Sequence, residues 1–146
     1  MTTPRKVVLN VALLVLRIGI GISFVFVYGY EKILGGPETW ANLGSNMAVL
    51  GITFWPVAWG FMAAFAEFAG GILLMLGLAF RPALVLLSGT MIVAALGHTL
   101  GDIGGGPWHA TEMLTVFIAL LLTGPGAFSL DALLFGSSDR NTSSYA

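Results

Sequence analysis

Residues 56–100 read PVAWGFMAAFAEFAGGILLMLGLAFRPALVLLSGTMIVAALGHTL and contain two apolar runs, 56–79 and 82–100, on either side of Arg81. Each run is close to the roughly 20 residues that a helix needs to cross the hydrocarbon core of a bilayer. The first run carries Glu67 as its one charge, and the second carries none. Two spans joined by so short a turn predict a pair of antiparallel membrane helices.

Two further apolar runs flank this helical pair. Residues 7–30 are long enough to span a bilayer, and residues 108–123 form a shorter run that tilt or local thinning of the bilayer can accommodate. We therefore expect an all-α protein, a four-transmembrane-helix bundle. We assign residues 1–135 to one membrane domain and residues 136–146, which are polar and rich in serine, to a disordered tail.

The composition agrees with a membrane protein and excludes several other classes. The chain of 146 residues is 57% hydrophobic and 9% charged, whereas a typical soluble domain carries about 25% charged residues. The net charge of −1 offers no basic surface for nucleic acid. The chain has no cysteine, which excludes disulfides, thiolate catalysis, cysteine-ligated metal sites and covalently attached haem.

Basic residues predict the orientation of the bundle, because loops rich in lysine and arginine stay on the cytoplasmic side. With the N-terminus inside, Arg5, Lys6, Arg81 and Arg140 all lie on the inner face, and Lys32 alone lies on the outer face. The opposite orientation would place four basic residues outside. We therefore predict that both termini are cytoplasmic.

Two shorter segments are predicted to lie at the membrane surfaces. Residues 35–54 are too polar to span and too apolar for a plain loop, which indicates a short interfacial or re-entrant segment on the outer face. Ser129 is a suitable N-cap for a short helix that ends near Phe135. This C-terminal helix would lie on the inner membrane surface.

Arg17 and Glu67 are the two charges deepest in the predicted spans. Counted along their helices, both fall near the bilayer midplane, where an unpaired charge costs at least about 2.5–3.5 kcal/mol. We therefore predict that the two side chains pair directly. Two purposes for such a pair stay open at this point, a structural ion pair that fixes helix register and a polar anchor or proton relay for a ligand.

A second polar cluster is expected in the outer half of the bundle. Helical spacing places Tyr28 on the same face of the first span as Arg17. In the third span His98 shares a face with Thr90 and Ala94, and in the fourth span His109 shares a face with Glu112. We therefore expect one polar cavity inside the bundle. The candidate residues in or beside this cavity are Arg17, Tyr28, Glu67, His98 and Glu112. His98, His109 and Glu112 are weak candidates for metal ligands, and we predict no metal.

Short motifs along the chain resemble those of the DoxX family of membrane proteins. The matching positions are Leu16, Arg17, Gly19, Gly21, Phe24, Gly29 and Lys32 in the first span, EFAGGILL at 67–74 with Gly77 and Arg81 in the second, His98 and Glu112 in the third and fourth, and GPG at 124–126 with SLDALL at 129–134 near the C-terminus. The resemblance extends from about residue 10 to 135.

The resemblance implies a multi-pass protein of the prokaryotic cytoplasmic (inner) membrane. It implies a component of a membrane redox complex, an oxidoreductase subunit that meets a bound quinone or a similar small apolar molecule and works with a redox partner subunit. The residues show no self-sufficient catalytic site. The alternative is a non-catalytic assembly factor, scaffold or small transporter whose buried charges are structural. Self-association into a homo-oligomer is compatible with either role.

The predicted topology can be tested with reporter fusions. A reporter fused after Arg140 should have cytoplasmic activity, and one inserted in residues 101–107 should have external activity, because the basic residues hold the other loops inside. The reverse pattern of activity at these two points would contradict the orientation.

Overall fold

The computed structural model describes residues 4–101 and 103–136. Most of the predicted polar tail, including Arg140, lies outside these residues. Within the described residues the chain forms helices and no strands, as predicted. In order, the elements are α1 (Pro4–Ile22), η1 (Ser23–Gly29), α2 (Tyr30–Leu34), α3 (Gly36–Gly44), η2 (Ser45–Leu50), α4 (Pro56–Leu76), α5 (Phe80–Leu100), α6 (Trp108–Thr123) and α7 (Leu130–Phe135).

The four predicted spans are present as helices. The first is a continuous helical stretch of 31 residues, Pro4–Leu34, which combines α1, η1 and α2. This stretch, α4 and α5 are each long and apolar enough to cross a membrane, and α6 is a shorter apolar helix. The first span therefore extends beyond the predicted bounds of 7–30 at both ends, while the bounds of the other spans differ from the predicted ones by a few residues at most.

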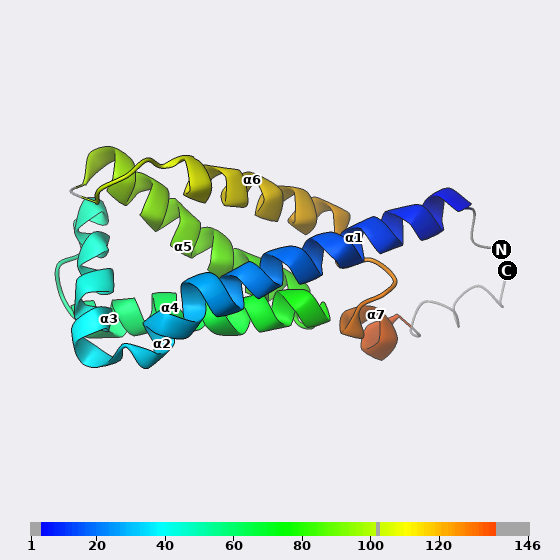
Figure 1. Ribbon diagram of the computed structural model, residues 1–146, viewed down its shortest axis with the longest axis horizontal. Helices are drawn as coiled ribbons and strands as arrows, with labels where there is room; N and C mark the ends of the chain where they lie inside the picture. Colours follow the sequence, from blue (N-terminus) through cyan, green and yellow to red (C-terminus); the bar gives the residue numbers. More distant parts are fainter. Residues whose placement is uncertain (1–3, 102, 137–146) are drawn as a thin grey trace, which may run out of the picture.

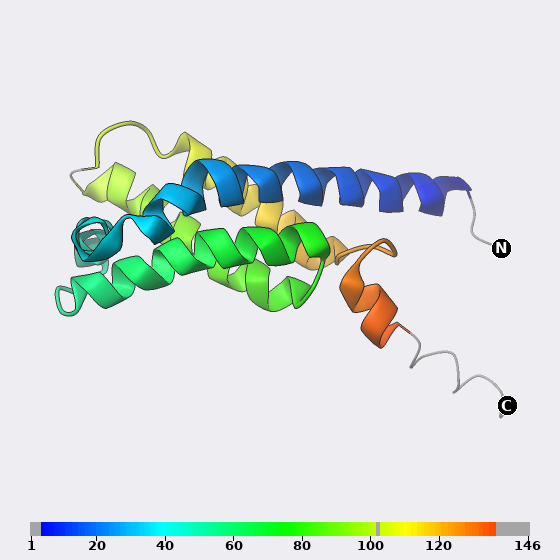
Figure 2. The same ribbon diagram turned by 60° about the horizontal axis from the view of Figure 1, so that its bottom comes forward.

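Successive long helices run in opposite directions along the molecule (Figure 1). Helix α1 lies beside α4 in both views, and α7 lies at the end of the bundle where α1 begins and α4 stops (Figure 2). We call this end the α7 end, and the opposite end, which holds α3 and η2, the α3 end. Helix α5 leaves the end of α4 after a short turn and diverges from it toward the α3 end (Figure 1).

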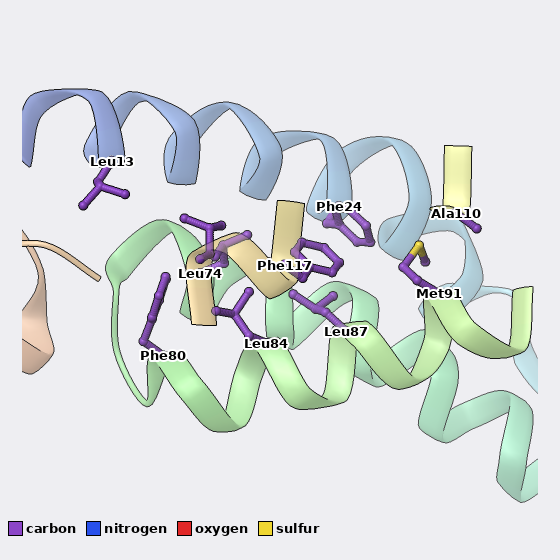
Figure 3. Close-up of a cluster of buried hydrophobic side chains, with 10 residues drawn as sticks. Leu13, Phe24, Leu74, Phe80, Leu84, Leu87, Met91, Ala110 and Phe117 are labelled. Carbon is purple, nitrogen blue, oxygen red and sulfur yellow. The ribbon is translucent and has the colours of Figure 1, made fainter. Parts of the chain in front are cut away.

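The packed core lies between α1, α5, α6 and the last turns of α4 (Figure 3). The rings of Phe24 and Phe117 are 5.3 Å apart between centroids and are both fully buried. Around them pack the other buried residues of the cluster, which are Leu13, Leu74, Phe80, Leu84, Leu87, Met91, Ala110 and Leu120. Because lipid tails are as apolar as these side chains, close packing rather than burial from water holds such helices together.

Close backbone contact sets the register of the first span against α4. A Cβ atom on Gly29 would lie 2.7 Å from the backbone nitrogen of Phe68, so glycine is required for this approach. The contact lies at the end of η1, a π-helical segment in which the Tyr30 amide donates to the Val25 carbonyl. A π-helical turn changes the direction in which the following side chains point. The segment thereby sets the direction of Lys32, one turn further on.

Residues 35–54 fold into α3 and η2, which bridge the diverging ends of α4 and α5 (Figure 1). Helix α3 packs against the start of α4, where a Cβ atom on Gly60 would overlap the Trp40 backbone. η2 follows directly and contacts α5. The location of this segment at the outer membrane surface stays a prediction.

The C-terminal helix has the predicted N-cap. The Ser129 hydroxyl accepts a hydrogen bond of 3.1 Å from the Ala132 amide. The Asp131 carboxylate accepts bonds of 2.9 Å from the Ala79 and Phe80 amides, and so it caps the start of α5. These contacts tie α7 to the turn between α4 and α5, and its location at the inner membrane surface stays a prediction.

Candidate functional site

Arg17 is fully buried and bound by backbone carbonyls at the α7 end. Its guanidinium donates to the Leu74 and Met75 carbonyls, each at 3.2 Å, to the Phe128 carbonyl at 2.9 Å, and to the Pro125 carbonyl. Two of these carbonyls belong to the last turn of α4, whose dipole favours a positive charge. Arg17 therefore joins α1, α4 and the segment before α7.

The predicted direct pair of Arg17 with Glu67 is wrong. Arg17 binds carbonyls at the end of α4, whereas Glu67 lies seven residues before Leu74, about 10 Å along the helix. Arg17 does lie near the middle of the 31-residue stretch Pro4–Leu34, but this stretch is offset along α4, so that its middle lies level with the last turn of α4 and not with Glu67. This offset brings Lys32 rather than Arg17 to the carboxylate.

Glu67 forms an ion pair with Lys32. The Lys32 ammonium lies 2.6 Å from one carboxylate oxygen, and the Glu67 side chain is only 6% exposed against 32% for Lys32. The indole of Trp40 donates a bond of 2.9 Å to the Lys32 carbonyl, which links the end of the first span to α3. The pair thus places a buried carboxylate and a less buried ammonium between α2 and α4.

A cavity of about 460 Å³ adjoins this ion pair, where α4 and α5 diverge and α3 and η2 bridge them. Its wall is mostly apolar, and Lys32, Glu67, Asn46, Thr90, Trp59 and His98 add polar groups. The remaining lining residues are Leu43, Gly44, Met47, Met62, Ala63, Ala66, Leu86, Gly89, Val93, Ala94 and Ile103. An apolar cavity with a few convergent polar groups is typical of a small-molecule site.

Two lining residues carry a buried ring nitrogen that lacks a hydrogen-bond partner. These are Nε1 of Trp59 and Nδ1 of His98, and neither finds a partner within the described part of the chain. Buried polar atoms of this kind are rare in folded proteins because each costs roughly 1–3 kcal/mol. Both residues line the cavity, so a ligand bound there lies next to two side chains that have an unpartnered nitrogen.

His98 reaches the cavity by the helical spacing that the sequence indicates. Thr90, Ala94 and His98 all line the cavity from α5, which confirms that they share one face. Trp59 and Glu67 line it from α4. Of the candidate residues, Glu67 and His98 are thus brought together, while Arg17 lies at the other end of α4.

Tyr28 and His109 form a separate aromatic pair behind the ion pair. Their rings stack at 4.8 Å between centroids, and the Tyr28 ring also contacts Phe24 at 5.5 Å. Tyr28 is half-buried and His109 is exposed, and neither lines the cavity. The pair therefore joins the exposed start of α6 to η1.

The expectation that Glu112 faces the interior is wrong, because its side chain is exposed. The buried face of α6 carries Ala110, Phe117 and Leu120, and a residue two positions after Ala110 points to the opposite side of a helix. Within residues 4–101 and 103–136 no three histidine or acidic side chains could hold a metal ion. His98, His109 and Glu112 accordingly do not converge.

The site can hold a polar head in an otherwise apolar pocket. A carboxylate fixed by an ammonium can exchange a proton with a bound group, and an indole N–H can donate a hydrogen bond to an acceptor. The sequence places Lys32 on the outer face but does not indicate its pairing with Glu67. Trp59 was also missed, although its spacing of four from Ala63 and of eight from Glu67 was the available signal.

Comparisons with known proteins find a family and two similar proteins. The DoxX family profile matches residues 12–100. The inner membrane protein YphA of Escherichia coli is 33% identical over 133 residues, which cover 83% of this chain and 89% of that protein. The inner membrane protein YqjF of the same organism is 32% identical over 132 residues, with 86% and 93% covered. No solved structure matches the chain.

The structure predicts that Arg17 stabilises the bundle. Replacing Arg17→Met leaves several buried carbonyls without a donor, and it should lower the free energy of unfolding in detergent by at least about 3 kcal/mol. The exposed Arg81→Met is the matched control and should change stability by less than about 1 kcal/mol. Equal effects of the two substitutions would contradict this role.

The ion pair makes a second stability prediction. Lys32→Met leaves the Glu67 carboxylate buried and unpaired, which should cost about 3–5 kcal/mol of unfolding free energy. Adding Glu67→Leu should restore most of this loss, because the double variant has no buried charge. The neighbouring exposed Glu31→Gln serves as control. A double variant less stable than Lys32→Met alone would contradict the pairing.

Proposed function

The chain belongs to the DoxX family of multi-pass inner-membrane proteins, and on this premise we propose that its cavity binds the head of a quinone or a similar small apolar molecule. The proposal makes the protein a component of a membrane redox complex. The single observation that carries it is the Lys32–Glu67 pair in the wall of a largely apolar cavity beside two unpartnered ring nitrogens.

The residues fit a head group with oxygen acceptors. The Trp59 indole can only donate a hydrogen bond, and the Lys32 ammonium can also only donate. Glu67 and His98 can each hold or release a proton. A quinone supplies carbonyl oxygens that accept such bonds, and it takes up protons together with electrons when it is reduced. In this proposal a reductase subunit in the same membrane supplies the electrons.

The role of each side chain follows from its position. Lys32 fixes the Glu67 carboxyl group at the cavity wall and offsets the cost of burying its charge. Glu67 exchanges a proton with the bound head group. We propose that the α3 end faces outward, as the distribution of basic residues predicts.

The alternative is a non-catalytic scaffold, assembly factor or small transporter with structural charges. Arg17 supports a structural purpose for one of the buried charges, because backbone carbonyls surround it. For Glu67 the same interpretation leaves the apolar cavity and the two unpartnered nitrogens without a purpose. A binding experiment on the ion pair separates the two functions.

We predict that the double variant Lys32→Met/Glu67→Leu folds but loses ligand affinity. Its equilibrium binding of a short-chain benzoquinone, measured on purified protein, should be at least about tenfold weaker, since one lost charge-assisted hydrogen bond is worth that factor. Glu112→Gln, outside the cavity, is the control and should bind like the unchanged protein. Unchanged affinity of the folded double variant would favour the structural alternative.

A further inference from the structure

The cavity has a rim on the side of the bundle that lipid would cover. Several lining residues are exposed at the molecular surface as well, among them Met62 on α4, at 55%, and Leu86 on α5, at 48%. Gly89 also lines the cavity and is exposed, and a Cβ atom there would meet no heavy atom within 4 Å. These residues mark an opening between α4 and α5.

The opening lies at the depth of the hydrocarbon core. Gly89 is nine residues after Phe80 and eleven before Leu100, so it lies about 14–17 Å from either end of α5. Half of a hydrocarbon core is about 15 Å. Water does not reach this depth on the lipid side of a bundle, and so the substances that meet the opening are dissolved in the membrane.

The gap between α4 and α5 is closed at both ends of the bundle. At the α7 end, α4 and α5 meet in the short turn that Asp131 caps. At the α3 end, where the two helices are farthest apart, α3 and η2 lie across the gap, and Leu43, Asn46 and Met47 line the cavity from there (Figure 1). The open side is therefore the lateral one, toward lipid.

We propose that the ligand enters sideways from the bilayer between Met62 and Gly89, and that it is a membrane-dissolved amphiphile with a long apolar tail. This proposal rests on the proposed function, and it adds the route by which the ligand enters and the apolar tail that the ligand carries. The polar head reaches the Lys32–Glu67 pair, and the tail lies in the opening and continues into lipid. An isoprenoid quinone has this chemistry, whereas a small water-soluble electron acceptor has no tail to fill the opening.

Glycine at position 89 gives a direct means of closing the opening. A phenylalanine there projects into empty space instead of into a neighbour, so Gly89→Phe should fold. The matched control is Gly19→Phe on α1, because Gly19 is another exposed helical glycine at which a Cβ atom would meet no heavy atom within 4 Å. Any loss specific to Gly89→Phe therefore reports on the opening.

The first test compares a long-tailed quinone with a tailless benzoquinone in lipid nanodiscs. Gly89→Phe should weaken binding of the tailed quinone by about tenfold or more, equivalent to about 1.4 kcal/mol, and Gly19→Phe should leave it unchanged. Binding of the tailless compound should fall much less in Gly89→Phe. Unchanged binding of the tailed quinone to Gly89→Phe would overturn the lateral route.

The second test detects lateral access without any quinone. Because the chain has no cysteine, Ala66→Cys places a single thiol in the buried cavity wall, and Ala64→Cys places one at a buried position of α4 outside the cavity. The thiolate adds across the double bond of a maleimide, with no leaving group. A lipid-soluble maleimide should label Ala66→Cys and leave Ala64→Cys unlabelled, while a charged, water-soluble maleimide should label neither.

Adding Gly89→Phe to Ala66→Cys should slow this labelling by about tenfold, and adding Gly19→Phe should leave its rate unchanged. Labelling by the charged maleimide alone, or labelling that Gly89→Phe does not slow, would overturn the lateral route. If labelling behaves as expected and neither quinone binds the unchanged protein, the opening exists and the proposed function fails. If the quinones bind and labelling ignores Gly89→Phe, the function stands and the route fails.

Discussion

A bilayer offers no partner for a buried charge, and the structure meets this constraint twice along α4. At the α7 end the last turn of α4 receives Arg17, whose guanidinium binds carbonyls of α4 and of the segment before α7. Seven residues earlier, Glu67 receives Lys32 from the end of the first span. These two contacts and the close approach at Gly29 together set the register of the first span against α4, and Arg17 also holds the segment before α7.

The two ends of the bundle consequently have different character. The large buried side chains gather where α1, α5 and α6 are close together, as the cluster around Phe24 and Phe117 shows (Figure 3). Toward the α3 end, α4 and α5 diverge and leave the cavity beside Glu67. The packed half holds Arg17, which four backbone carbonyls bind, and the open half holds Glu67, beside two ring nitrogens without hydrogen-bond partners. The second half is therefore the candidate for binding.

Much of the fold could be predicted from the sequence because long apolar runs have few alternatives in a membrane. The helical spacing of Thr90, Ala94 and His98 likewise gave one face of the cavity. Counting residues along separate apolar runs could not give the partners of Arg17, because it does not show how far the first span is offset along α4. Trp40, Leu43 and Met47 do have helical spacing within residues 35–54, but this spacing does not show that α3 and η2 bridge the diverging ends of α4 and α5.

The central claim is that the cavity between α4 and α5 holds the head of a membrane-dissolved quinone beside Glu67. The most direct measurement is photo-crosslinking of the unchanged protein, in its native membrane, with a quinone that carries a photoactivatable group on its ring, followed by mass spectrometry of the labelled peptides. We expect labels in α4 near Trp59 and Glu67 and in α5 near His98, and we expect unlabelled quinone to compete with them. Labels confined to the lipid-facing surfaces of α1 and α6, or labels that unlabelled quinone does not displace, would contradict this claim.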